Sequence, residues 1–495
     1  MRISIATGLA LAALSLPPSA QLTSQDIEKA VRDTAPQYAL SDPLAAKEAS
    51  QESTLEDQTD LAITVYNASR ALVRDRRAVK LQAGEHALRF MDVAESILPE
   101  TVSLQSLSAP GKLHILEQNY EFDLMSPEKL MEKYVGKKVK LINQNKDLDF
   151  VEKEATLLSV NNGPVYEVDG AIYLGHPGNV VLPSIPEELI AKPTLIWLLN
   201  NEVTDHEVEA TYITGGIDWK ADYVVTLNRE ETALNLEGWV TLNNQSGATY
   251  RNAELKLVAG EVNVVQDRMD MPRMAKAAMM EMAAGAPAMV EEAFGEYHLY
   301  TLPRRTTIKQ NQSKQVSLLT GTDIKANKIY EYRGNVSYYA QRIPQVQDKI
   351  DVFLKFQNEE ANQLGVPLPA GIMRVYQPDS SGALQFSGED RLNHTPKDEE
   401  VRLRLGQAFD VTGERVQTNY NRLSDNVHDA SFEITLKNHK ETDITVDVVE
   451  PMPGDWEMRD NNLEYEKKDA FTAIFHVPVK ADGEAVVKYT VRVTF

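Results

Sequence analysis

Residues 208–258 read VEATYITGGIDWKADYVVTLNREETALNLEGWVTLNNQSGATYRNAELKLV, and hydrophobic side chains recur at alternate positions through much of this stretch. Alternation with period two predicts half-buried strands, which we place at 208–213, 222–227, 236–242 and 253–258. Turn-forming residues separate these strands, at 215–216, 229–231 and 244–247. Short strands at this spacing are typical of an antiparallel β-sandwich. The stretch therefore predicts one immunoglobulin-like module.

The same alternation continues toward the C-terminus. Further strands are expected at 297–302, 315–319, 329–339 and 350–356, and again at 401–405, 432–436, 444–448 and 487–495. We therefore predict a mainly β protein with tandem antiparallel β-sandwich (immunoglobulin-like) modules and few short helices.

Two predicted hairpins resemble each other. Residues 241–244 (TLNN) precede a turn and the alternating segment 253–257, and residues 435–438 (TLKN) precede a turn and the segment 444–448. A duplicated module would explain this similarity, and so would turn chemistry shared by any two polar hairpins. The sequence leaves both explanations open.

The region before these modules is expected to be more mixed. Strands are predicted at 61–66, 79–81 and 87–90. A helix is predicted over 126–135, because Ser126 is a suitable N-cap, Pro127 suits the first helical position and Gly136 follows the last turn. The short alternating segments after this helix predict a small barrel or sheet, inserted between outer strands.

The first twenty residues predict a signal peptide. The basic Arg2 precedes an apolar segment at 3–16, and residues 17–20 (PPSA) break the helix before small residues, as such a peptide requires. Residues 21–60 are polar and acidic, which predicts a flexible leader. A prior of about 150 residues per domain suggests three regions in the remainder. We place an N-terminal β-rich region at 61–205, a central sandwich at 206–394 with a Met-rich loop at 268–292, and a C-terminal sandwich at 395–495.

Composition narrows the class of protein. The chain has 495 residues, no cysteine and a formal net charge of −22, so cysteine-bound metals and thiolate nucleophiles are excluded. An exported chain without disulfides fits the periplasm, with secretion as the less favoured alternative. Nucleic acid is not expected as a partner, since it selects for basic patches. Beyond the signal peptide no apolar segment is long enough to cross a bilayer, so no integral membrane protein is expected after its removal.

Several motifs occur in an order that resembles a known family. They begin with Tyr212, Gly215, Gly216, Trp219 and Tyr223, and continue with Gly238, Trp239, Asn244, Ser246, Gly247, Tyr297, His298 and Trp456. From about Leu61 to the C-terminus, the chain resembles the bacterial domain-of-unknown-function family 4139. This resemblance implies a mostly β exported protein of no established activity, without known catalytic residues to transfer.

The motif residues also have physical interpretations of their own. The pair 215–216 permits a turn with positive φ, and Trp219 and Tyr223 could anchor a corner on the sandwich core. The segment 244–247 has hairpin-turn chemistry, and Gly238 predicts a bulge or a close backbone approach within a strand. Most of these residues are therefore expected to be structural. The alternative is an aromatic binding shelf.

The Met-rich loop is the most unusual segment. Its methionines are Met269, Met271, Met274, Met279, Met280, Met282 and Met289. The simplest interpretation is a mobile, Ala-rich loop or a short amphipathic helix. A copper(I) site is a second possibility, because the first three methionines have thioether spacing. The third is an adaptable apolar surface that binds a partner, because methionine repacks easily.

No catalytic, cofactor-binding or metal-binding residue is predicted. Nucleophile-elbow, zinc-protease and phosphate-loop motifs are absent, and the nine histidines are scattered, with His206 and His476 expected on strand surfaces or edges. We therefore favour an exported binding or scaffold protein that presents loops to an envelope protein or polymer. The alternative is a hydrolase of envelope polysaccharide or peptide, with carboxylates that a single sequence cannot pair.

Overall fold

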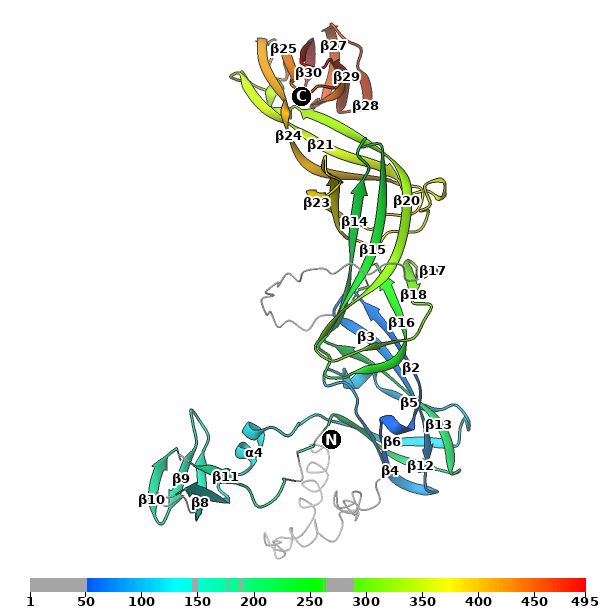
Figure 1. Cartoon of the computed structure of the whole chain (residues 1–495), viewed down its shortest axis with the longest axis vertical. Helices are drawn as coiled ribbons and strands as arrows, with labels where there is room; N and C mark the ends of the chain where they lie inside the picture. The colour runs from blue at the N-terminus through cyan, green and yellow to red at the C-terminus, as the bar shows by residue number, and fades with distance from the viewer. Residues whose placement is uncertain are drawn as a thin grey trace, which may run out of the picture.

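A computed structural model of the chain describes residues 51–144, 150–175, 178–186, 189–190, 192–260, 262–263 and 289–495. The molecule is elongated, with the C-terminal strands at one end and the first strands toward the other (Figure 1). Strands dominate, and α4 (Pro127–Lys133) is the one α-helix in the described residues. The predicted mainly β class is confirmed.

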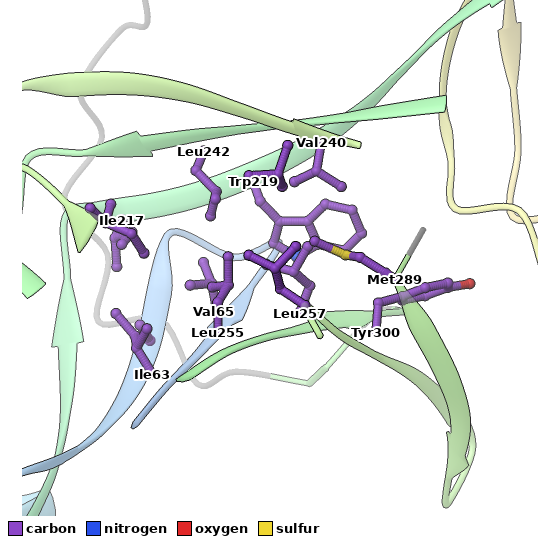
Figure 2. Close-up of a cluster of buried hydrophobic side chains, with 14 of the residues drawn as sticks. Ile63, Val65, Ile217, Trp219, Val240, Leu242, Leu255, Leu257, Met289 and Tyr300 are labelled. Carbon is purple, nitrogen blue, oxygen red and sulfur yellow. The ribbon is translucent and has the colours of Figure 1, made fainter. Parts of the chain in front are cut away.

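The first sandwich packs one sheet against the first half of another. The order of the first sheet is β17-β18-β16-β2-β3-β13-β5, with strands β2 (Gln58–Tyr66), β3 (Arg70–Lys80), β5 (Ser103–Ser106), β13 (Asp205–Gly215), β16 (Tyr250–Ala259), β17 (Val290–Phe294) and β18 (Tyr297–Thr301). The short β19 (Thr306–Ile308) also pairs with β16. The facing strands are β14 (Ile217–Leu227), β15 (Ala233–Asn244), β22 (Gly371–Pro378) and β23 (Leu384–Leu392). Side chains of both sheets meet in one core around Trp219 (Figure 2).

Three long strands connect this sandwich to the next one. They are β20 (Gln312–Arg333), β21 (Val346–Gln357) and β24 (Glu400–Arg422). Each contributes to both hydrophobic cores: Ile324 of β20 lies in the first core, for example, and Tyr332 in the second. The predicted strands 315–319 and 329–339 are therefore parts of a single strand, which ends at Arg333.

The second sandwich closes around its own core at the C-terminus. Its remaining strands are β25 (Val427–Asn438), β26 (Ile444–Pro451), β27 (Asp455–Asn461), β28 (Glu466–Asp469), β29 (Thr472–Val479) and β30 (Gly483–Thr494). One continuous sheet runs through both sandwiches in the order β23-β22-β14-β15-β20-β21-β24-β25-β30-β27.

The two sandwiches repeat the same hairpin arrangement. Strands β15 and β16 in the first correspond to β25 and β26 in the second, and β16 and β26 each pair in parallel with a strand that starts their module, β2 and β20. Asn244 Nδ2 donates to the oxygens of Ala248 at 2.8 Å and Lys309 at 3.1 Å. Asn438 Nδ2 donates likewise to Thr442 at 2.9 Å and Lys480 at 3.0 Å. The equivalent bonds favour duplication over chance similarity.

Replacing either asparagine by alanine is expected to destabilise the protein to a similar degree. Asn244 and Asn438 are fully buried, and each variant leaves backbone groups of two loops without a partner, at a cost of about 1–3 kcal/mol. Urea unfolding measures the change, with Asn421→Ala as a control on an exposed position of β24. A loss no larger than that of the control at either position would contradict the equivalence.

The N-terminal region adds two smaller sheets. The first has the order β1-β4-β12-β6, with β1 (Gln51–Ser53), β4 (Gly84–Met91), β6 (Leu113–Glu121) and β12 (Thr194–Asn201). The second, here called the inserted sheet, has the order β10-β9-β8-β7-β11, with β7 (Lys138–Gln144), β8 (Phe150–Ser159), β9 (Val165–Val168), β10 (Ala171–Leu174) and β11 (Asn179–Val181). We predicted a small barrel or a sheet for this region. The inserted sheet does not close on itself, so the structure supports the sheet. It projects sideways from the body (Figure 1).

The helical turns of the described residues are one α-helix and four 3₁₀ helices. Helix α4 begins as predicted, with the Ser126 side chain accepting from the amide of Lys129, but ends at Lys133. The remaining turns are 3₁₀ helices: η2 (Leu55–Asp57), η3 (Pro99–Thr101), η4 (Val336–Tyr339) and η5 (Glu360–Asn362).

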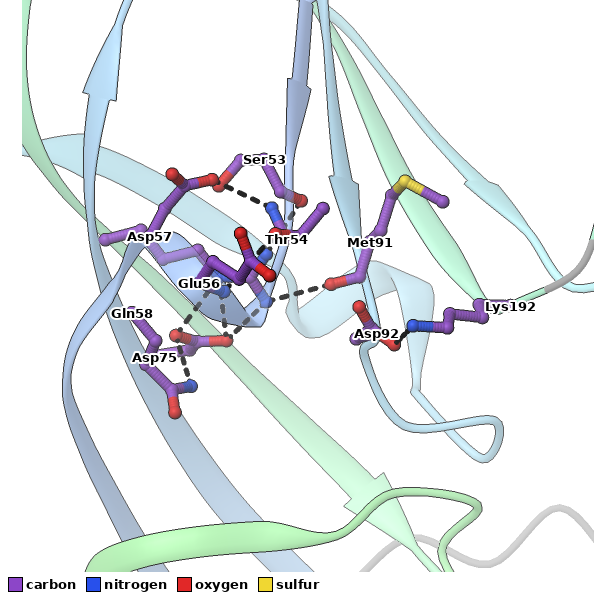
Figure 3. A network of polar contacts seen from close by, with 10 residues as sticks. Ser53, Thr54, Glu56, Asp57, Gln58, Asp75, Met91, Asp92 and Lys192 are labelled. Carbon is purple, nitrogen blue, oxygen red and sulfur yellow. Dashed lines mark hydrogen bonds and ion pairs between the residues drawn. The ribbon is translucent and has the colours of Figure 1, made fainter.

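Two features differ from the predicted layout. Residues 51–60, expected in the flexible leader, form β1, η2 and the start of β2. The Arg77 guanidinium fixes them, since it donates to the Ser53 oxygen at 2.9 Å and pairs with Asp75 at 2.8 Å (Figure 3). The cores also combine residues across positions 205 and 394, so our three regions remain a prediction about folding units. The predicted signal peptide and leader residues 21–50 lie outside the described residues.

Candidate functional site

The aromatic motif residues of the first sandwich are core residues. Tyr212, Trp219 and Tyr223 are at most 4% exposed. The Trp219 indole N–H donates to the Val258 oxygen at 3.3 Å, and the Tyr223 hydroxyl donates to the Pro369 oxygen at 2.7 Å. Burial raises the pKa of Tyr212 and Tyr223 well above their usual value. Rings buried in this way leave no face for a ligand, which favours packing over an aromatic shelf.

The glycine motifs mark close approaches of the backbone. Gly216 has φ +73°, and a Cβ there would lie 2.7 Å from the Gln245 oxygen. Gly247 has φ +90°, and a Cβ there would collide with the Glu95 side chain. Gly215, by contrast, has no positive φ. A Cβ on Gly238 would lie 3.0 Å from the Leu319 side chain, and the register of β15 and β20 shifts at this glycine. The close approach expected at Gly238 is present, and the bulge beside it has its extra residue, Leu318, on the partner strand β20.

The remaining motif residues make local contacts. Ser246 is fully buried and donates to the side chain of Asn244 at 2.8 Å. Trp239 is half-buried, and the Tyr297 ring covers Gly260. The Trp456 N–H donates to the Ala470 oxygen at 2.8 Å, and the Lys467 ammonium lies 4.7 Å from the ring centre. His298 Nδ1 lies 2.7 Å from Glu291 Oε1, a contact that ties β18 to β17. These contacts all suit a structural role.

The Met-rich loop mostly lies outside the described residues. Among its methionines the structure describes Met289 alone, whose side chain is buried against the core beside Tyr300 (Figure 2). The partner-binding interpretation of Met269, Met271, Met274, Met279, Met280 and Met282, and the copper(I) alternative, stay predictions.

Buried carboxylates are held by arginines. Each has an ion-pair partner: Asp75 with Arg77, Glu209 with Arg76, Asp222 with Arg374, Glu331 with Arg402, and Glu450 with Arg415. Where a carboxyl pKa is displaced, hydrogen bonds and cations displace it downward, as at Asp379, where bonds from Ser381 and Gln385 lower the pKa to about 2. A general acid needs the opposite displacement. In the described residues, no group of three or more histidines and carboxylates could hold a metal ion.

Two histidines differ in their surroundings. His206, expected on a surface, is 3% exposed and bonds Ser106 Oγ and Asn201 Oδ1, each at 2.8 Å. Because the Ser106 hydroxyl also accepts from the Ala109 amide, it caps a turn. His476 is exposed as expected and lies between two carboxylates, 2.7 Å from Asp447 and 3.2 Å from Glu466.

His476 is expected to make stability depend on pH. The hydrogen bond to Asp447 raises the pKa of His476 despite partial burial, with a further contribution from Glu466. The folded protein therefore holds the proton more tightly, so the stabilisation is complete below the unfolded pKa of about 6.5 and is lost as pH rises through the folded pKa. Urea midpoints at pH 5.5 and 8.5 should differ less in His476→Gln than in wild type. An unchanged difference would contradict this assignment.

A cleft of about 230 Å³ lies at the junction of the two sandwiches. Lys440 Nζ, from the loop after β25, donates to the Tyr330 hydroxyl of β20 at 2.8 Å. Lys328 Nζ and Gln377 Nε2 both donate to Glu231 Oε1, at 2.7 and 2.8 Å. Burial would raise the pKa of Glu231, but these bonds lower it overall. The polar groups satisfy one another across four segments, so they brace the junction.

Exposed apolar side chains gather in the N-terminal region instead. Of the twenty large hydrophobic residues that the described part of the chain exposes, eleven lie between 113 and 185: Ile115, Leu116, Phe122, Val135, Val151, Leu158, Ile172, Tyr173, Leu174, Val181 and Ile185. Eight of these belong to α4's end, the inserted sheet and the segment after it. Concentrations of exposed apolar surface mark interaction sites. The inserted sheet is therefore the candidate functional site.

Comparison with known families assigns most of both sandwiches to one family. The model of the domain of unknown function DUF4139 matches residues 208–495, more than half of the chain. The chain belongs to this family. The DUF4139 region holds most of both sandwiches, whereas the inserted sheet lies outside it. No match was found among curated proteins. Within the described residues, no helix has the length and apolar character needed to cross a membrane.

Sequence reasoning located the inserted sheet but missed its exposed edge. The hairpin that forms this edge, although not its exposure, could have been found from the segment 165–174 (VYEVDGAIYL), in which Asp169-Gly170 is a strong hairpin signal and the strand after it carries no charge.

Proposed function

We propose that this DUF4139 protein is an exported, periplasmic binding or scaffold protein, in which the fused sandwiches hold the inserted sheet in a fixed position for an envelope partner. The apolar segment 3–16 supports export, and the lack of cysteine supports the periplasm as the compartment.

The observation that carries the proposal is the sharing of strands between sandwiches. Strands β20, β21 and β24 enter both cores, so the modules have no linker that could act as a hinge. Relative motion of domains is the usual expectation where a flexible linker joins them. Here the two sandwiches form a single stiff body, which suits a scaffold.

The junction reinforces this stiffness. The Lys440–Tyr330 bond ties the second sandwich to β20, and Glu231 joins the turn between β14 and β15 to β20 and β22. A surface that is rigid before binding loses less entropy when a partner arrives.

The inserted sheet is attached to this body at two adjacent strands. The chain leaves through β6 and returns through β12, and these strands pair with Thr194 opposite Glu121. The pairing extends outward, because Leu124 bridges Ile190 in parallel and the Met125 amide donates to the Ile190 oxygen at 2.9 Å. The described residues of the two connecting segments are thus bonded to each other beyond the ends of β6 and β12.

Site-specific photo-crosslinking in cells tests the proposal. A photoreactive amino acid at Ile185, 59% exposed beside the inserted sheet, is expected to give discrete crosslinked species. The same amino acid at Lys437, on an exposed position of β25, is the matched control. Equal or absent adducts at both positions would overturn the proposed function.

A further inference from the structure

We propose that β10 is a docking edge, to which a partner protein adds one extended strand with apolar residues between basic ones. This inference rests on the proposed function and names the partner class of the same site.

The first step is that β10 has an open side. It is the last strand of the inserted sheet and pairs with β9, from Ala171 opposite Val168 to Leu174 opposite Val165. No other strand of the described residues pairs with it. Its outer N–H and C=O groups are therefore available to a partner backbone, which is the basis of strand addition.

The second step is that this edge, although short, carries no charge, proline or bulge. Natural proteins protect edge strands with lysine, proline or bulges. Residues 171–174 are Ala-Ile-Tyr-Leu, and the register with β9 is unbroken. The side chains of Ile172, Tyr173 and Leu174 are 60%, 43% and 87% exposed. A strand added here would cover apolar side chains on both faces of the sheet.

The third step fixes which faces the partner covers. Ile172 lies opposite Glu167, and Tyr173 lies opposite Tyr166, which is fully buried in the core of the inserted sheet. Directly opposed residues share a face, so Tyr173 borders the core and Ile172 and Leu174 border the outer face. An incoming strand would extend the core on one side and cover two aliphatic side chains on the other.

The fourth step concerns charge. On the outer face Lys138 pairs with Glu154, and Lys140 with Glu152. Glu167 lies on this face next to β10 and has no ion pair with a described residue, which leaves one negative charge beside the edge. A lysine or arginine of the partner would complement it. The net charge of −22 disfavours a second copy of the chain or an anionic membrane as the occupant.

The edge is also held in place before binding. Asp169 and Gly170 have φ +52° and +78°, the signs that a two-residue hairpin turn requires. The Tyr134 hydroxyl donates to the Ser184 oxygen at 2.7 Å, which fixes α4 to the segment after β11. Binding would need little reorganisation of the sheet.

Purified full-length protein and a defined peptide test the inference. The probe is Lys-Val-Thr-Val-Thr-Val-Lys with blocked ends, and binding is measured by calorimetry and by amide exchange at 171–174. We expect slower exchange at these amides on binding. Leu174→Lys should weaken binding at least tenfold, since it replaces an apolar contact by a charge that repels the lysines of the peptide and offsets Glu167. Leu384→Lys, at an exposed aliphatic position of β23 outside the inserted sheet, is the control and should stay within about twofold.

Further experiments distinguish strand addition from dimerisation and from adsorption to a membrane. A peptide with its five central amides N-methylated should not bind, because it cannot pair with the edge; equal binding would overturn strand addition. Replacing both lysines by glutamate should weaken binding. Dimerisation of the wild type that Leu174→Lys abolishes, or adsorption to neutral phosphatidylcholine vesicles through Leu174, would also overturn the proposal. Crosslinks in cells at Ile185 but not at Leu174 would leave the scaffold function standing and remove the docking edge.

Discussion

Replacing Glu450 by alanine is expected to lower the free energy of unfolding by about 3–5 kcal/mol, because it leaves a buried arginine without its counter-ion. Arg415 and Glu450 are both fully buried in the second sandwich, and Arg415 Nη2 lies 2.6 Å from Glu450 Oε1. Glu450 Oε2 also accepts from the hydroxyls of Tyr339 at 2.7 Å and Tyr489 at 3.0 Å. Burial would lower the pKa of Arg415, but Glu450 outweighs it and holds this pKa well above its usual value.

The double variant Arg415→Met/Glu450→Leu is the matched control. It removes both charges and retains apolar volume, so we expect it to recover most of the stability that Glu450→Ala loses. Denaturant unfolding gives both values. If Glu450→Ala lowered the free energy of unfolding by less than about 1 kcal/mol, the loss would lie in the range of exposed ion pairs. That result would contradict the burial of the Arg415–Glu450 pair.

Trp219→Ala is expected to cost about 3–5 kcal/mol, the usual range for truncating a buried tryptophan. The indole of Trp219 lies between the two sheets of the first sandwich, beside Leu257 and Met289 (Figure 2). Its removal leaves a cavity that the long strands around it cannot close. The melting temperature and the urea midpoint should both fall.

Trp239→Ala is the control for this prediction. Trp239 is half-buried on the neighbouring strand β15, so its truncation should cost clearly less. If the two variants were equally mild, and Trp219→Ala instead lost a ligand, the aromatic-shelf alternative would replace the packing role.

Local patterns were sufficient for much of the fold. Alternation in β14, β15, β21 and β25 reflects burial of every second side chain against one core, so the strands were predictable. The N-cap of α4 depends on neighbouring residues and was predictable for the same reason, whereas the helix ends two residues before the predicted position. The close approach at Gly238 was also predictable, because a glycine within a strand often marks a place where another group comes close to the backbone.

Features that depend on distant contacts were not predictable. We predicted two strands where the structure has the single strand β20. Its first half pairs with β15 and its second half with β21, and the sequence does not show that one strand serves both partners. The end of the predicted leader is ordered by Arg77, which donates to the oxygens of Ser53 and Met91, 24 and 14 residues away in the chain.

The candidate site was less accessible to sequence reasoning than the fold. We placed partner binding on the Met-rich loop, where Met289, the one methionine described, is a core residue. The exposed edge at β10 could not be recognised, because an apolar strand such as 171–174 reads the same at the centre of a sheet as at its edge. Exposure distinguishes the two, and it belongs to the folded structure.

The distance distribution between the two sandwiches tests the account most directly. Because the chain has no cysteine, spin labels can be attached at Lys80→Cys on β3 and Lys437→Cys on β25, both exposed strand positions. If β20, β21 and β24 join the sandwiches into one stiff scaffold, pulsed electron spin resonance should give one narrow distribution that neither salt nor temperature broadens. A broad or two-peaked distribution would contradict the scaffold.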